Sequence, residues 1–172
     1  QCQGNAGVGN ERFSAPVIAG LPVWYLEGQL AKFKQGFRGF RAEDTTGLQM
    51  RPMARSLVTE GDLKAVSAYV AAMKPVLPAS TVKGDAVKGQ AAWAPCLACH
   101  GADGKGNQAL GAPTITHQAD WYLLSQLQKF KSGLRGTHPK DTTGMQMRAM
   151  SMTLADDQAM RDVVAYVRTL VK

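Results

Sequence analysis

Apolar residues recur at helical spacing in two segments of the second half of the chain. The first segment, 121–131, predicts a helix with Asp120 as its N-cap. Its apolar face consists of Trp121, Leu124, Leu127 and Phe130. The second predicts a C-terminal helix entered through Thr153-x-x-Asp156, which resembles a capping box. Its apolar face consists of Met160, Val163, Val164, Val167 and Leu170.

The segments between these helices are rich in Gly, Pro and Thr, and no alternating strand pattern persists. The sequence therefore predicts an all-α fold of short helices and long loops. Loops this long in so small a domain need something to pack against.

The first half of the chain repeats in the second half. A shift of 97 residues aligns the halves without gaps, and 32 of the first 74 residues are then identical. A period of this length predicts tandem domains rather than a solenoid. We expect one domain over 1–75, a linker over 76–84 and a second domain over 85–172. The C-terminal apolar face recurs in the first repeat as Leu63, Val66, Tyr69, Val70 and Met73.

Cys96-Leu-Ala-Cys99-His100 is the pattern of covalent c-type haem attachment. Two thiols one helical turn apart can add to the two haem vinyl groups, and the adjacent His reaches the iron from the same side. A zinc site would need further thiols or histidines at suitable spacing. A thioredoxin-like motif would need a βαβ pattern, which the sequence lacks. We therefore expect haem c as the cofactor.

The first repeat departs from this motif, because Cys2 aligns with Cys99 and Gln3 stands where His100 stands. Either the first repeat is degenerate, or its start is shortened or misassigned. We expect one haem per chain, and two if an intact motif begins upstream of residue 1. Cys2 and Met50 mark the possible second haem site.

Around the haem motif, the chain resembles a class I cytochrome c, and the tandem arrangement resembles the cytochrome c4 family. The resemblance implies helical domains wrapped around haem and a periplasmic electron-transfer role. The further residues that carry it are Gly89-x-x-x-Trp93, Gly101, Gly104-x-Gly106-Asn107, Pro113, Trp121-Tyr122-Leu123, Gln126-Leu127, Gly133-x-Arg135-Gly136, Met147-x-x-Met150 and Ala165-Tyr166-Val167.

The sixth iron ligand is predicted to be Met147. Of the methionines after the haem motif, only Met147 and Met150 recur in the first repeat, as Met50 and Met53. In similar cytochromes the ligand lies seven residues before the Leu that opens the C-terminal helix, which is Leu154 here. A thioether ligand raises the reduction potential relative to a second imidazole. Met150, which we expect near the haem edge, and the loop residues His117 and His138 remain as alternatives.

The resemblance also implies roles around the haem. The carbonyl of Pro113 would accept a hydrogen bond from Nδ1 of His100. Trp121, Tyr122 and Arg135 are candidates for the surroundings of the haem propionates. Gly89 and Trp93 would pack a short helix against Tyr166.

The net charge of +7, from 20 Lys and Arg against 13 Asp and Glu, suits an acidic redox partner. No basic run of the kind that binds nucleic acid occurs, nor does an apolar run long enough to cross a membrane. One stripe of cations recurs in both repeats and is either a solvated helix face or a docking patch. Its members are Lys129, Lys131 and Arg135, repeated as Lys32, Lys34 and Arg38.

The sequence thus predicts a periplasmic cytochrome that passes single electrons between a dehydrogenase or quinol-oxidising complex and a terminal acceptor, and that is not itself an enzyme. Two alternatives stay open. One is a haem enzyme, either a peroxidase or a sulfur-compound dehydrogenase. The other is the soluble part of a larger membrane complex, anchored by a segment outside this sequence.

Overall fold

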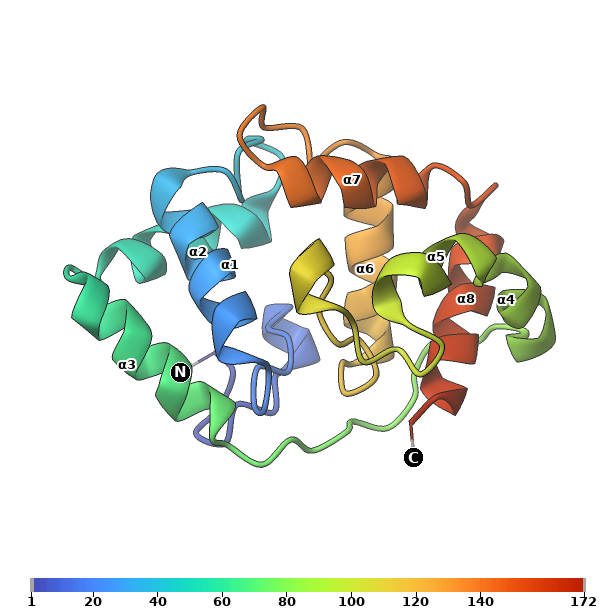
Figure 1. Cartoon of the computed structure of the whole chain (residues 1–172), viewed down its shortest axis with the longest axis horizontal. Coiled ribbons are helices and arrows are strands. Elements are labelled where there is room, and N and C mark those ends of the chain that lie inside the picture. Colours follow the sequence, from blue (N-terminus) through green and yellow to red (C-terminus); the bar gives the residue numbers. More distant parts are fainter. Residues whose placement is uncertain (1, 172) are drawn as a thin grey trace.

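The computed structural model describes residues 2–171, and its two sequence repeats lie side by side (Figure 1). The first repeat forms α1 (Val23–Gln35), α2 (Thr45–Arg55) and α3 (Glu60–Ala71). The second forms α4 (Ala86–Ala92), α5 (Ala94–His100), α6 (Asp120–Lys131), α7 (Thr142–Ser151) and α8 (Asp157–Thr169). Two short 3₁₀ helices, η1 (Glu11–Phe13) and η2 (Gln108–Leu110), occupy equivalent loops. The predicted all-α fold is confirmed.

The strongest apolar core belongs to the second repeat, where α6 and α8 pack together. The predicted faces are confirmed by the burial of Leu124 and Phe130 on α6 and of most apolar residues of α8. The corresponding cluster of the first repeat contains only three buried residues, Leu21, Leu26 and Val70. Within residues 2–171, no helix is both long and apolar enough to span a membrane.

Helix α4 lies against α8 at close range because Gly89 has no side chain. A methyl group at Gly89 would overlap the carbonyl oxygen of Asp162 and the side chain of Tyr166. Trp93, which follows α4, is buried with its ring centroid 6.0 Å from that of Tyr166. The packing expected of Gly89 and Trp93 is confirmed.

The predicted apolar face of α3 is wrong at one position. Tyr69, the counterpart of Tyr166, is 67% exposed. Tyr166 is covered by α4 and Trp93, whereas residues 2–22 of the first repeat contain no α-helix that could cover Tyr69.

Two predicted helix starts also differ from the structure. The N-cap of α6 is Ala119, and Asp120 is the first helical residue. The carboxylate of Asp120 instead accepts hydrogen bonds from the linker, at 2.6 Å from Ser80 Oγ, 2.6 Å from Thr81 N and 2.8 Å from Val82 N. The N-cap of α8 is Asp156, so Thr153 and Asp156 do not form the predicted capping box. Thr153 lies one turn earlier, and its hydroxyl donates a hydrogen bond to the carbonyl oxygen of Met150.

The recurring cation stripe is neither a solvated face nor a free docking patch. Lys32 Nζ lies 2.5 Å from Asp141 Oδ1, and Lys129 Nζ lies 2.6 Å from Asp44 Oδ1, so each repeat pairs a lysine with an aspartate of the other. The remaining members of the stripe also have partners within the protein. Lys34 and Lys131 donate to backbone carbonyls, and Arg38 and Arg135 donate to glutamine and tyrosine side chains.

Other polar and aromatic contacts continue this interface between the repeats. The side-chain amide of Gln118 makes two hydrogen bonds with the backbone of Val17, each 2.9 Å long. His138, expected to be an exposed loop residue, is half-buried and stacks on Phe37 at 4.5 Å between ring centroids. His117 is exposed, as expected.

Replacing Gly89 by Ala should lower the free energy of unfolding by about 1–3 kcal/mol or more, because the methyl group forces α4 away from α8. The matched control is Gly28→Ala on α1, where the new methyl group meets nothing within 4 Å. That change should stabilise the protein by about 0.5–1 kcal/mol, since Ala is the better helix former. Urea unfolding of the full-length protein measures both, and effects of the same sign would contradict the packing described here.

Asp120→Ala should cost about 1.5–3 kcal/mol of stability at neutral pH, because the linker amides lose a charged acceptor. Burial alone would raise the pKa of Asp120, but the hydrogen bonds from Ser80, Val82 and Thr81 outweigh burial and lower the pKa. The stabilisation is therefore present above the unfolded pKa of about 3.9 and is lost as the pH falls through the lower folded value. Urea midpoints of the wild type and the variant should converge in strong acid, whereas Glu43→Ala, at a site whose side chain is 64% exposed, should change little at any pH.

Candidate functional site

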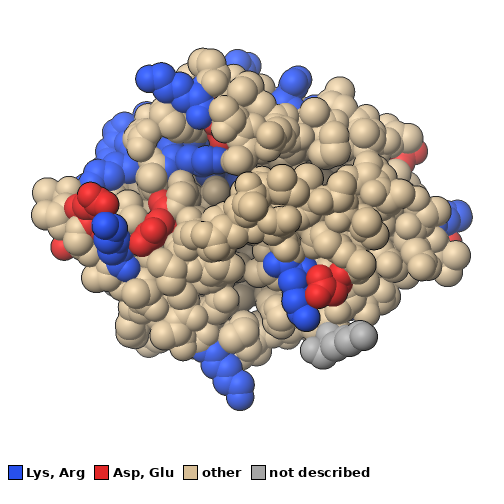
Figure 2. All heavy atoms as spheres, viewed as in Figure 1, with Lys and Arg blue, Asp and Glu red and all other residues tan. Residues whose placement is uncertain are grey.

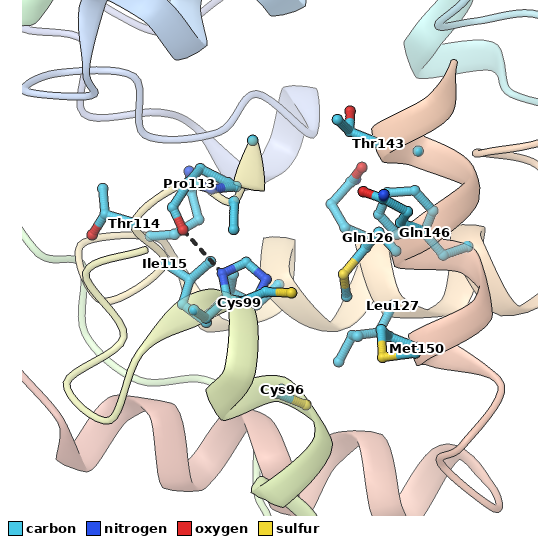
Figure 3. Close-up of a pocket in the computed structure, with 18 of the residues that line it drawn as sticks. Cys96, Cys99, Pro113, Thr114, Ile115, Gln126, Leu127, Thr143, Gln146 and Met150 are labelled. Atoms are coloured by element: carbon cyan, nitrogen blue, oxygen red, sulfur yellow. Dashed lines mark hydrogen bonds between the residues drawn. The ribbon is translucent and has the colours of Figure 1, made fainter. Parts of the chain in front are cut away.

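A cavity of about 180 Å³ lies between α5 and α7 in the second repeat (Figure 3). The haem-motif residues Cys96, Cys99 and His100 line it from α5, and Met147 and Met150 line it from α7. The structure thus brings the two thiols, the imidazole and both candidate thioethers to one space.

Helix α5 places the motif at the wall of this cavity. Pro95 lies in the first turn of α5, where a missing N–H costs nothing, and Gly101, with φ of 77°, ends the helix directly after His100. Cys96 and Cys99 are three residues apart, so their sulfur atoms project from successive turns of one face.

His100 is held by the hydrogen bond that the resemblance implied. Its Nδ1 donates to the carbonyl oxygen of Pro113 at 3.0 Å, the contact drawn as a dashed line in Figure 3. This bond fixes the tautomer, and it leaves Nε2 as the ring nitrogen available to a metal.

The loop before Pro113 is fixed by backbone contacts that sequence reasoning missed. Asn107 and Ala112 form an antiparallel bridge, and Gly106 adopts a φ of 84°. A methyl group at Gly106 would overlap the backbone of Ala112 and Pro113. The same glycine and bridge recur in the first repeat, as Gly9 with Asn10 and Ala15, which was the available sequence signal.

Burial favours the neutral forms of His100 and Cys96. Burial lowers the pKa of His100, only partly opposed by the hydrogen bond to Pro113. Burial, followed by the neighbouring Cys99, raises the pKa of the Cys96 thiol to about 11. A neutral imidazole is the form that binds a metal.

Helix α7 supplies the opposite wall. Asp141 caps it by accepting a hydrogen bond from Gly144 N at 3.1 Å. Met147 is half-buried and Met150 is 37% exposed, so Met147 is the more enclosed of the two thioethers.

Of the three residues predicted to surround the haem propionates, two lie at the cavity and one does not. Tyr122 and Arg135 line the cavity, whereas Trp121 is not among its lining residues and packs edge-on against Tyr122 with ring centroids 5.8 Å apart. The Arg135 guanidinium stacks on the Phe130 ring at 4.4 Å and donates to Gln126 Oε1 at 2.7 Å. Burial, followed by the nearby Arg38, lowers the pKa of Arg135.

Four lining residues come from the first repeat, which the sequence analysis did not foresee. They are Leu21, Tyr25, Gln29 and Lys32, the last three on α1. The cavity of the second repeat is therefore completed by the first.

The first repeat has a cavity of its own, of about 300 Å³. Gln3, Pro16, Met50 and Met53 line it at positions equivalent to His100, Pro113, Met147 and Met150. Cys2 is exposed and is not among its lining residues.

The cavity of the second repeat fits haem c in its donor chemistry. It presents two free thiols, an imidazole with one nitrogen already oriented, and thioethers on the facing helix. The buried Nε atoms of Arg135 and Trp93 have no hydrogen-bond partner within residues 2–171. Arg135, which lines this cavity, donates to uncharged acceptors, so carboxylates of a ligand could balance its positive charge.

Comparison with known proteins agrees with this geometry. The Cytochrome c family matches residues 86–171, half of the chain. The thiosulfate dehydrogenase electron acceptor of Stutzerimonas stutzeri (strain A1501) is 31% identical over 161 residues, which cover 87% of this chain and 70% of the relative.

Two solved structures share the fold of the whole chain. Cytochrome c4 of Acidithiobacillus ferrooxidans superposes with a TM-score of 0.77 at 26% identity, covering 96% of this chain and 94% of that chain. Thiosulfate dehydrogenase of Marichromatium purpuratum gives a TM-score of 0.75 at 31% identity, covering 98% of this chain but 35% of that one. With its haem motif, its cavity and these matches, the chain belongs to the cytochrome c family and has the tandem two-domain arrangement of cytochrome c4.

Proposed function

We propose that this protein is a one-electron carrier whose second domain holds one haem c, bound through Cys96 and Cys99 and ligated by His100 and Met147. The observation that carries the proposal is that α5 brings an imidazole, and α7 a thioether, to the same cavity. We also propose domain limits of 1–75 and 85–172, joined by a linker over 76–84.

The two proposed iron ligands favour a carrier over an enzyme. The bound group would supply an iron that alternates between the ferrous and ferric states. His100 and Met147 would hold the iron in either state, so no position would open for a substrate. Pro113 holds the imidazole ring in place, and the apolar residues around the cavity exclude water, which keeps reorganisation small.

We propose a periplasmic location and a redox enzyme as partner. The relative named as an electron acceptor of thiosulfate dehydrogenase favours a dehydrogenase as the donor. The net charge of +7 favours an acidic docking face on that partner. In the view of Figure 2, many lysines and arginines lie over the half formed by α1 to α3, whereas the central surface carries few charges.

The first domain, in this proposal, carries no haem. Gln3 offers an amide where the second domain offers an imidazole, and an amide is a poor iron ligand. Cys2 could form one thioether at most, and its side chain is exposed.

Met147→Ala should abolish the weak red absorption band that signals methionine ligation of ferric iron, and should lower the reduction potential. The haem should stay covalently attached through Cys96 and Cys99. Met150→Ala removes an equal thioether from the same helix and should leave the band in place. A retained band in Met147→Ala, with loss in Met150→Ala, would assign the ligand to Met150 instead.

The protein should contain one haem per chain. A pyridine haemochrome assay against protein mass measures the ratio on the purified full-length protein. Mass spectrometry of tryptic peptides should find haem on the peptide that contains Cys96 and Cys99 and none on Cys2. Two haems per chain would overturn the assignment of the first domain as haem-free.

A further inference from the structure

We propose that Lys32 of the first domain is a positioning residue for Met147 of the second, because it holds the N-terminus of α7 across the domain interface. This inference rests on the proposed function of Met147. Lys32 Nζ lies 2.5 Å from Asp141 Oδ1 and 2.5 Å from Thr143 Oγ1. Both partners stand at the start of α7, the helix that carries Met147.

The oxygen that Lys32 binds is also the oxygen that caps the helix. Asp141 Oδ1 accepts the hydrogen bond of Gly144 N, and the backbone carbonyl of Asp141 accepts that of Met145 N at 2.8 Å. A carboxylate at this end of a helix is favoured by the helix dipole. Lys32 therefore holds in place the carboxylate that caps the first turn of α7.

Apolar packing contributes little to holding α7. The only fully buried residues described in this helix are Gly144 and Ser151, both small. Met145 and Met150 are 40% and 37% exposed. With so little apolar burial, the position of α7 depends on the polar contacts at its N-terminus.

Burial makes the contact with Lys32 consequential. The side chain of Asp141 is 1% exposed and that of Lys32 is 21% exposed. Removing the cation would leave a buried carboxylate without its counter-charge, a much larger perturbation than the loss of a surface ion pair.

The first domain contains the mirror image of this contact, which supplies a matched control. Lys129 of the second domain binds Asp44 Oδ1 at 2.6 Å and also Thr46 Oγ1, at the start of α2. Asp44 caps α2 through Gly47 N, as Asp141 caps α7. Lys32 lines the cavity that contains Cys96 and His100, whereas Lys129 lines the cavity of the first domain.

The test compares Lys32→Gln with Lys129→Gln in the full-length protein carrying its haem. The first readout is amide hydrogen exchange measured by mass spectrometry, which requires no spectroscopic signal from the iron. Lys32→Gln should speed exchange in α7 by about tenfold or more and leave α2 unchanged, and Lys129→Gln should do the reverse.

The second readout is the red methionine–iron band during urea titration. Urea is uncharged, so it does not screen the ion pair. Lys32→Gln should lower the urea midpoint for loss of the band, and Lys32→Arg, which keeps the cation, should restore it. Lys129→Gln should leave that midpoint at its wild-type value.

Unchanged exchange in α7 of Lys32→Gln would overturn the proposal, and so would an equal loss of the band in both glutamine variants. A faster-exchanging α7 with an unchanged band midpoint would also overturn it, since Lys32 would then position the helix without positioning the ligand. Failure of the proposed ligand itself is separate, because only Met147→Ala without loss of the band would show it.

Discussion

The central constraint on this structure is that each domain contains a cavity beside its apolar core cluster. Side chains of α1, α6 and α7 border these cavities. The first domain buries three apolar residues in its core cluster, and α7 of the second buries only two small residues. Apolar packing can therefore fix α8, α6 and α4, but it contributes little to fixing α7.

Buried polar groups do that instead. His100 is oriented by a carbonyl, Asp120 holds the linker, Gln118 joins the two domains, and Asp44 and Asp141 each cap a helix and bind a lysine. Each of these contacts is directional, so it specifies an orientation that dispersion contacts would leave loose. A redox site benefits from this, because axial ligands that stay in place in both oxidation states need little rearrangement.

The local features were the ones readable from the sequence. Cys96 to His100 is a contiguous motif, and the apolar faces of α6 and α8 follow from spacing along one chain. The role of the Pro113 carbonyl was implied by the resemblance to class I cytochromes c. The contacts between domains were not readable in this way. The spacing of Lys32, Lys34 and Arg38 places them in one region of α1 and the loop after it. Spacing alone does not show whether these side chains face water or a second domain.

Two further errors have the same origin. Asp is a residue type favoured at N-caps, yet the carboxylate of Asp120 accepts hydrogen bonds from linker residues 38 to 40 positions earlier in the chain. Tyr69 copies Tyr166, but its exposure depends on whether another helix lies beside it. The local sequence pattern predicts where a helix forms. Segments distant in the sequence decide which partner each of these polar or aromatic side chains contacts.

The reciprocal lysine–aspartate pairs make the contact between the domains equivalent to the isologous interface of a homodimer, in which residue i meets j and j meets i. Covalent connection changes the thermodynamics of such an interface. A short linker holds the second domain at an effective concentration on the order of millimolar, independent of how dilute the protein is. Contact between the two halves therefore does not depend on the concentration of the protein.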